Sequence, residues 1–162
     1  FYDILTCRAG VLSTPDPAIS EALCRVFTEH STYALYDDVT PVLAQLRARG
    51  NRIGVISNWE GWLHDLLGAQ GLTEQFECVI VSGTVGLEKP DPAIFELAFT
   101  QMGVSPHECT YVGDSLEYDV APSLALGVTP VLIDRRDRHS AQTLPCRRIT
   151  SLFELLDPRD PA

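Results

Sequence analysis

Polar side chains able to bind an anion or a metal ion follow three short apolar segments of this 162-residue chain. The first pair, Ser57 and Asn58, stands at the end of an apolar run that begins at Arg52. A hydroxyl and an amide at such a position can donate hydrogen bonds to an anionic oxygen. Serine and asparagine are also good N-caps, so the alternative that they only begin the next helix stays open.

The second group surrounds Lys89, the single lysine among the twelve basic residues. Pro90 and Pro92 stiffen the backbone around it, and Asp91 with Pro92 has the pattern of a helix start. A lysine beside the positive end of a helix dipole is repelled by that dipole. The position therefore suits phosphate binding better than it suits stability, and the alternative is a solvated surface lysine.

The third group is the run from Val112 to Asp119, in which Gly113-Asp114 follows an apolar segment and a second aspartate comes five residues later. Gly113 permits a sharp turn at that point. Two carboxylates, Asp114 and Asp119, that meet at the mouth of a sheet provide the hard oxygen ligands that Mg²⁺ prefers. The alternative is that both aspartates only favour a helix N-terminus electrostatically.

The elements that must position these groups alternate between strand and helix from about residue 36 onward. This order predicts an α/β fold, a three-layer Rossmann-like parallel sheet with helices on both faces. Ligands bind such sheets at the carboxyl ends of the strands, where all three groups stand. The expected strands are 52–57, 77–82, 109–113, 130–133 and an edge strand at 147–150, and the expected helices are 39–49, 62–69, 91–102 and 118–126, with a last one after a capping box at Ser151.

The opening residues do not fit this alternation. The segment 1–10 has the pattern of a helix end, and Asp16-Pro17 has the pattern of a helix start. Two helices ahead of an α/β unit indicate a separate helical subdomain. We therefore expect one unit at 1–34 and an α/β core at 35–162.

Charge and composition exclude several classes of partner. The net charge is −10, which disfavours nucleic acid and anionic membranes. No apolar run approaches the ~18 residues of a membrane span. The five cysteines are odd in number and form no Cys-x-x-Cys pair, which favours a reducing, cytoplasmic compartment.

We assign no chemistry to three further groups. Asp37 and Asp38 are expected to cap the helix that follows them. The loop at 134–138 is expected to be solvated and self-paired. Trp59 and Trp62 flank the Ser57-Asn58 loop and could line a substrate pocket or pack against the protein; both alternatives stay open.

Taken together, the three groups resemble motifs two, three and four of the haloacid dehalogenase superfamily. The motifs are the strand ending in Ser57-Asn58, Lys89-Pro90 at a helix start, and the strand ending in Gly113-Asp114 with Asp119. Each is weak alone, but their order and spacing match. The sequence is most similar to the phosphatase-like branch with a helical cap, and 1–34 resembles the C-terminal part of that cap.

The resemblance implies a role for each residue. Ser57, with Asn58, would bind the transferring phosphoryl group of a small phosphorylated metabolite. Lys89 would neutralise charge on the nucleophile and on the phosphate. Asp114 would ligate Mg²⁺, and Asp119 would support the metal directly or through water. The Gly-Asp pattern favours phosphate ester hydrolysis over cleavage of a carbon–halogen bond.

The sequence departs from the family in its first motif, Asp-x-Asp-x-Thr, which the chain lacks. In the family its first aspartate is the nucleophile, and its strand lies in the centre of the sheet between those ending at Ser57 and Gly113. Unpaired backbone groups at such a gap cost about 1–3 kcal/mol each, against a total stability of ~5–15 kcal/mol. We expect this central first strand to come from about a hundred upstream residues, from another chain by strand exchange, or from a homo-oligomer.

Three functions remain. The first is a Mg²⁺-dependent phosphomonoester hydrolase that in its complete form acts through an aspartyl-phosphate. On this hypothesis residues 1–162 alone are inactive, because they lack the aspartate nucleophile. The second is a non-catalytic interaction or structural module on the same fold. The third is a haloacid dehalogenase or a phosphonatase.

Overall fold

The computed structural model describes residues 16–157, and its contacts divide the chain into units at 1–35 and 36–162. In the first unit, helix α2 (Pro17–Thr28) precedes a short 3₁₀ helix, η1 (His30–Thr32). The Asp16 carboxylate accepts a hydrogen bond from the Ala18 amide at 2.9 Å, which confirms the predicted helix start. The expected helix end at 1–10 lies outside the described residues.

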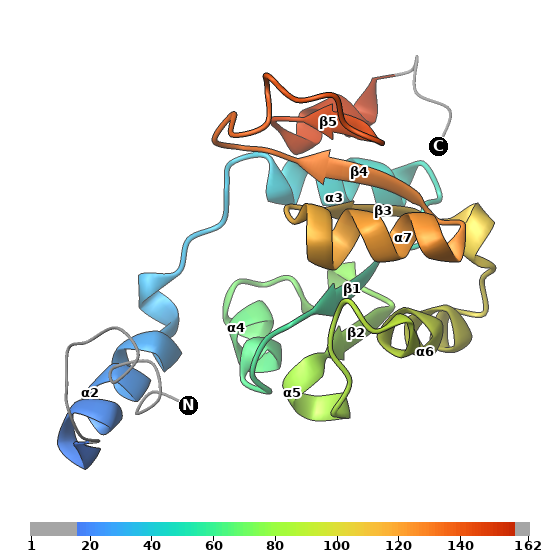
Figure 1. Cartoon of the computed structure of the whole chain (residues 1–162). Helices are drawn as coiled ribbons and strands as arrows, with labels where there is room; N and C mark the ends of the chain where they lie inside the picture. The colour runs from blue at the N-terminus through green and yellow to red at the C-terminus, as the bar shows by residue number, and fades with distance from the viewer. Residues whose placement is uncertain (1–15, 158–162) are drawn as a thin grey trace. The chain divides into compact units, whose positions relative to one another are not determined.

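The second unit contains five parallel strands at the expected positions (Figure 1). They form two separate sheets, one of β1 and β2 and the other of β3, β4 and β5 in that order. The predicted edge strand is confirmed as β5. The strands are β1 (Gly54–Ser57), β2 (Cys78–Val81), β3 (Thr110–Gly113), β4 (Thr129–Ile133) and β5 (Arg147–Ile149).

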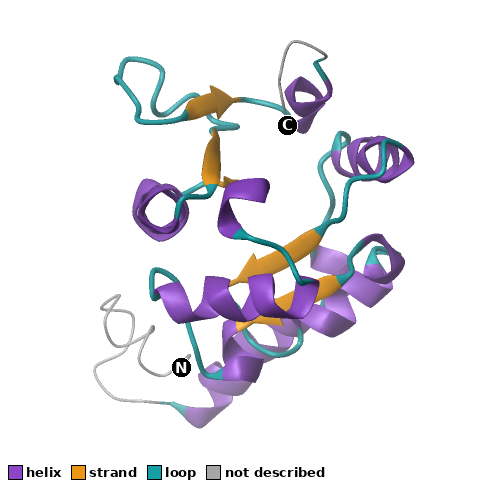
Figure 2. Ribbon diagram, turned by 90° about the vertical axis from the view of Figure 1, so that its right-hand side faces the viewer, coloured by secondary structure: helices purple, strands orange, loops and turns teal. Residues whose placement is uncertain are grey.

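Helices border the strands on both sides (Figure 2), as an α/β fold of parallel strands requires. Gly103 and Gly127, both with left-handed φ, end α6 and α7 directly after residues 102 and 126, where the expected helices end. The helices are α3 (Val39–Ala48), α4 (Leu63–Ala69), α5 (Ser82–Val85), α6 (Pro92–Met102) and α7 (Ala121–Leu126), with short turns η2 (Thr73–Gln75), η3 (Pro106–Glu108), the π-helix η4 (Leu116–Val120) and η5 (Leu152–Leu156).

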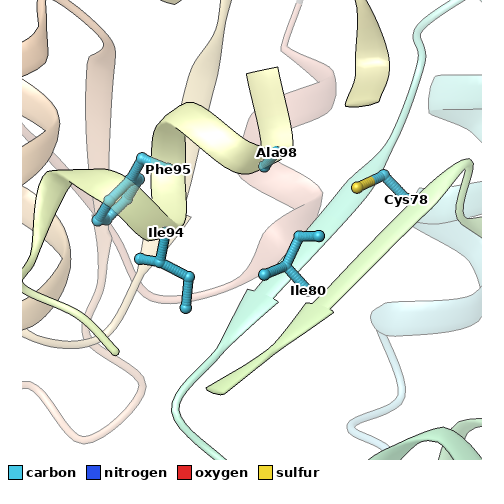
Figure 3. Close-up of a cluster of buried hydrophobic side chains, with 5 residues drawn as sticks. All are labelled: Cys78, Ile80, Ile94, Phe95 and Ala98. Atoms are coloured by element: carbon cyan, nitrogen blue, oxygen red, sulfur yellow. The ribbon is translucent and has the colours of Figure 1, made fainter. Parts of the chain in front are cut away.

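A buried apolar cluster joins β2 to α6 (Figure 3). Cys78 and Ile80 are two residues apart in the strand, so their side chains point to the same face of the sheet. They meet Ile94, Phe95 and Ala98 from the helix. Burying an aliphatic or aromatic side chain of this size contributes about 1.5–3 kcal/mol. The cluster therefore anchors the first turns of α6 and, with them, the loop that carries Lys89.

One edge of β1 and one edge of β3 have no strand partner within residues 16–157. Gly54 and Thr110 are exposed although both lie in strands. The Tyr111 hydroxyl, on β3, lies 3.2 Å from the carbonyl oxygen of Ile56, on β1, so a single side chain spans the interval between the two sheets. This is the arrangement expected of the family's fold when its central strand is not among the described residues.

Candidate active site

A cavity of about 600 Å³ opens at the carboxyl ends of β1, β3 and β4. Its lining includes three of the residues predicted from sequence, Lys89, Asp114 and Asp119. Ser57 and Asn58 are not among the lining residues, although Ile56, next to Ser57, is. The structure thus brings two of the three sequence motifs into one cavity, and the third lies beside it.

Lys89 and Asp119 form a close ion pair in this cavity. The Lys89 Nζ lies 2.6 Å from Asp119 Oδ1, and the two side chains are only 12% and 4% exposed. Lys89 also donates a hydrogen bond to the Tyr111 hydroxyl at 3.2 Å, and that hydroxyl lies 3.3 Å from Asp119 Oδ1. Burial makes such charge-assisted contacts stronger than they would be in water. The ammonium group is therefore held at a defined point of the cavity wall.

The backbone at Lys89 is clamped by the Asn58 side chain. The Lys89 amide donates to Asn58 Oδ1, and Asn58 Nδ2 donates to the Lys89 carbonyl, both at 2.8 Å. The peptide bond to Pro90 is cis, and the Asp91 carboxylate caps α6 by accepting from the Ala93 amide. Asn58 thus joins the end of β1 to the lysine loop. The Asn58 amide is engaged by these two hydrogen bonds, which leaves it less free to bind a substrate. Substrate binding by Asn58 stays a prediction.

Asp119 is positioned by a π-helical turn after β3. The Ser115 amide donates to Asp119 Oδ2 at 2.9 Å, and the Ser115 hydroxyl accepts from the Tyr118 amide. A Cβ at position 113 would overlap the Asp119 carboxylate. Only glycine therefore fits at the end of β3. Gly113 lies within the strand and does not have a positive φ, so its role is steric and not the sharp turn expected from the sequence.

Asp114 differs from Asp119 in having no hydrogen bond or ion pair with another described residue. It is exposed at the end of β3 and faces the cavity. Within residues 16–157, no group of three or more histidine, cysteine or acidic residues is arranged to hold a metal ion. Among the three described aspartates that line the cavity, Asp114 is the one with both carboxylate oxygens free to bind a cation. Metal ligation by Asp114 and Asp119 stays a prediction.

Tyr111 belongs to the site although we did not select it from the sequence. Burial, then the charge of Asp119 and a hydrogen bond to it, and then the charge of Asp114 hold the pKa of the Tyr111 hydroxyl well above its usual value. The group therefore stays protonated and can donate. Its signal in the sequence was its position two residues before Gly113, because alternate residues of a strand share a face.

The loop after Ser57 is closed by backbone contacts. The Trp59 amide donates to the Ser82 hydroxyl at 3.0 Å, and that hydroxyl donates back to the Trp59 carbonyl. The rings of Trp59 and Trp62 pack edge to face, with centroids 5.5 Å apart, and neither lines the cavity. Trp59 is nevertheless exposed, so a substrate pocket and packing both stay predictions for the two tryptophans.

The prediction that the Asp38 side chain caps α3 was wrong. Asp38 occupies the N-cap position but makes no capping hydrogen bond. Its buried carboxylate instead accepts two hydrogen bonds from Arg135, at 2.8 and 2.9 Å, and others from the Ser151 hydroxyl and the Leu152 amide. The Arg135 guanidinium, chief among these donors, holds the pKa of Asp38 well below its usual value.

The prediction of a solvated loop at 134–138 was wrong for Asp134, which is 5% exposed. Burial alone would raise the pKa of Asp134. Hydrogen bonds from the His139 and Arg138 amides and from Arg148 outweigh that effect and lower it. The expected self-pairing is present, since Arg148 also contacts Asp137 at 2.8 Å. The loop is therefore an ordered wall of the cavity.

Comparison with known proteins relates the chain to one family. A model described as haloacid dehalogenase-like hydrolase matches residues 8–127. A phosphoserine phosphatase from Thermus thermophilus is 36% identical over 132 residues, which are 80% of this chain and 53% of that protein. A glyceraldehyde 3-phosphate phosphatase from Methanopyrus kandleri is 32% identical over 142 residues, 83% of this chain and 58% of that protein. Among solved structures, a HAD phosphatase from Thermococcus onnurineus has a TM-score of 0.69 and 32% identity, covering 75% of this chain and 56% of that one.

The matched region contains every residue selected from the sequence, from Ser57 to Asp119. The chain spans about half the length of the curated relatives it matches. Within the described part of the chain, no helix is both long and apolar enough to cross a membrane.

Proposed function

Because the chain belongs to the haloacid dehalogenase-like hydrolases, we propose that the complete protein hydrolyses phosphomonoesters of small metabolites with the help of Mg²⁺. The observation that carries this proposal is the buried Lys89–Asp119–Tyr111 cluster beside the unpaired Asp114 in one cavity. The names of the two curated relatives describe phosphatases of small phosphorylated compounds, which supports the same substrate class.

Lys89 binds the phosphoryl oxygens in this proposal. The Lys89 side chain is only 12% exposed, so the attraction of its ammonium group to an anion is screened less than that of a surface lysine. Asp119 and the Tyr111 hydroxyl fix the orientation of the ammonium before the substrate arrives. A preorganised cation of this kind stabilises the charge that develops in the transition state without a cost of reorganisation. Ser57 donates a further hydrogen bond to the phosphoryl group.

Asp114 would hold the Mg²⁺ ion. The donor set fits in chemical type, because an exposed, unpaired carboxylate at the end of a strand is a hard oxygen ligand. One free carboxylate does not complete a coordination sphere, so Asp119, directly or through water, further water molecules and groups outside those described would supply the other ligands. When bound, the ion supplies positive charge that neutralises the phosphoryl oxygens.

The nucleophile is the part of the catalyst that residues 1–162 do not contain, since they include no Asp-x-Asp pair. We place it on a parallel strand that pairs with the open edges of β1 and β3. Such a strand would satisfy the backbone groups of both edges and would end at the cavity, beside Lys89. It comes from an upstream segment or from another chain, and its first aspartate attacks phosphorus to form an aspartyl-phosphate.

The test measures release of p-nitrophenol from p-nitrophenyl phosphate, with and without Mg²⁺, by the 162-residue chain and by the full-length protein. Turnover in the full-length protein alone supports the proposal. In that protein, Lys89→Ala and Asp114→Asn should each lower kcat by about 100-fold or more, because each removes a charge that the transition state needs. Arg52→Gln, which removes an exposed arginine outside the cavity, is the matched control. Near-normal rates in both site variants would remove these assignments.

A non-catalytic module is the second candidate, and the absence of an Asp-x-Asp pair is the observation that favours it. It predicts that phosphate binds without turnover in either form of the protein. A dehalogenase or phosphonatase is distinguished by its products, because it would release halide from a 2-haloacid, or phosphate from a phosphonate, in preference to hydrolysing the phosphate ester.

A further inference from the structure

The loop between β4 and β5 (Figure 1) brings positive charge to the cavity of an acidic protein. The chain has twelve basic residues and a net charge of −10. Four of the twelve line this one cavity: Lys89, Arg135, Arg136 and Arg138. Three of the four are consecutive or nearly consecutive in the β4–β5 loop. The same lining contains three aspartates, Asp114, Asp119 and Asp134, so with histidine counted as neutral the cavity has a formal charge of +1 in a chain of net charge −10. This local excess of positive charge favours an anionic ligand.

The four cations divide into two pairs with different surroundings. Lys89 is bound to Asp119, and Arg135 is held in two-point contact by Asp38, so both have carboxylate partners. Arg136 and Arg138 are exposed. Their guanidinium groups have neither an ion pair nor a hydrogen bond with any residue in the described part of the chain. The second pair is therefore available to a ligand, whereas the first pair is engaged.

The backbone that carries Arg136 and Arg138 is held at several points. The Asp134 carboxylate accepts hydrogen bonds from the Arg138 amide at 2.9 Å and from the His139 amide at 2.8 Å. Arg148 bridges Asp134 and Asp137, at 3.0 and 2.8 Å. An arginine in a solvated, unanchored loop would have to order its backbone on binding, and here that ordering is already present.

Between the two arginines, Asp137 adopts a left-handed conformation, with φ of 53°. Non-glycine residues adopt this region rarely, aspartate more readily than most, and they do so where the surrounding structure imposes it. The turn is imposed here by the contacts of Asp134 and Arg148. Together these contacts fix the positions from which Arg136 and Arg138 extend, while their charged ends stay unpaired.

We propose that Arg136 and Arg138 form an anion subsite, which binds a second carboxylate or phosphate group on the phosphomonoester substrate. This inference rests on the proposed function, because the same cavity holds the phosphoryl-binding Lys89 and the unpaired Asp114. Guanidinium groups bind carboxylate and phosphate oxygens through paired hydrogen bonds, so either group fits. The subsite therefore selects substrates that carry two anionic groups over those that carry one.

The experiment compares matched substrates in the full-length protein. Ethyl phosphate and carboxymethyl phosphate are similar in size and differ in the carboxylate, and propyl phosphate with 1,3-propanediol bisphosphate makes the corresponding pair for a second phosphate. The measured quantity is the ratio of kcat/KM within each pair. It is determined for the parent protein, for Arg136→Gln, for Arg138→Gln and for the double variant. Arg52→Gln, equal in charge change but outside the cavity, is the control.

The parent should prefer, in at least one pair, the member that carries two anionic groups. Each single variant should lower that preference about tenfold, as expected for the loss of one charged hydrogen-bonding partner, and Arg52→Gln should leave it unchanged. The pair that responds identifies the second group as carboxylate or phosphate. A ratio that stays the same in the double variant would overturn the subsite while leaving the hydrolase proposal intact. If the parent hydrolyses p-nitrophenyl phosphate but none of the four esters, the subsite fails and the hydrolase proposal stands. If it hydrolyses neither p-nitrophenyl phosphate nor the four esters, both proposals fail.

Discussion

Asp38→Asn should be among the most destabilising conservative substitutions in the second unit. The Asp38 side chain is 5% exposed and that of Arg135 is 19% exposed, so the substitution leaves a largely buried guanidinium without its counter-charge. Removing one partner of a buried pair costs about 3–5 kcal/mol. Asparagine can still accept from the Ser151 hydroxyl or the Leu152 amide. We therefore expect a loss at the low end, about 3 kcal/mol of the free energy of unfolding.

Urea unfolding of the full-length protein at pH 7 measures this loss, with Glu77→Gln as the matched control. The Arg52–Glu77 pair has the same N···O distance as the Asp38–Arg135 pair, 2.8 Å, but both of its side chains are about half exposed. An exposed pair contributes about 0–1 kcal/mol. The two ion pairs have the same N···O distance and differ in burial, so a difference between the two losses of stability reports the effect of burial. Equal losses in both variants, or a loss below about 1 kcal/mol for Asp38→Asn, would refute the reasoning.

The pH dependence of the same difference has a fixed sign. Hydrogen bonds from Arg135, the largest cause, hold the pKa of Asp38 in the folded protein below its unfolded value. The carboxylate's contribution is therefore fully present above the unfolded pKa, about 3.9, and is lost as the pH falls toward the folded pKa. The difference between parent and Asp38→Asn should stay constant from about pH 7 to 5 and shrink below about pH 4. A difference equally large at pH 3 would show that the charge is not its source.

Two further substitutions test the site. Tyr111→Phe should lower the free energy of unfolding by about 1 kcal/mol and reduce kcat in the full-length protein, because the hydroxyl contacts both Lys89 and Asp119. Tyr118→Phe, at an exposed ring, is its control in the same assays, and equal effects would argue against a specific role for the Tyr111 hydroxyl. Gly113→Ala should abolish turnover and lower the free energy of unfolding by at least ~1–3 kcal/mol, because the added methyl overlaps the Asp119 carboxylate. Unchanged stability by calorimetry together with unchanged turnover would contradict that steric account.

Much of the fold could be predicted because its signals are local. Mainly apolar runs of four to six residues became strands β1 to β4, and glycine after a periodic segment ended α6 and α7. Asp91-Pro92 began α6 with the capping bond that its residue types predict. The turn at Leu116–Val120 became π-helical, which the apolar pattern could not indicate because the pattern only reports which face is buried.

The site was predicted in part, for a related reason. Lys89, Asp114 and Asp119 stand in loops at strand ends, so their residue types and positions indicated their chemistry. Asn58 was selected for substrate binding, yet its amide is engaged by the backbone of Lys89, 31 residues away. Tyr111 lies inside a strand, where an aromatic residue ordinarily indicates packing.

The sequence by itself determined the strands, the helix ends and the set of polar residues at the strand ends, because these depend on neighbours a few positions apart. The tertiary structure alone decided which charges meet. Asp38 and Arg135 are 97 residues apart, and Lys89 and Asp119 are 30 apart. Electrostatic pairing depends on distance in space. That distance is set by how the parallel strands and their connecting segments pack, and not by separation along the chain. The same packing left Asp114, Arg136 and Arg138 in one cavity without a side-chain partner among residues 16–157, and that difference separates the residues available to ligands from those that hold the fold together.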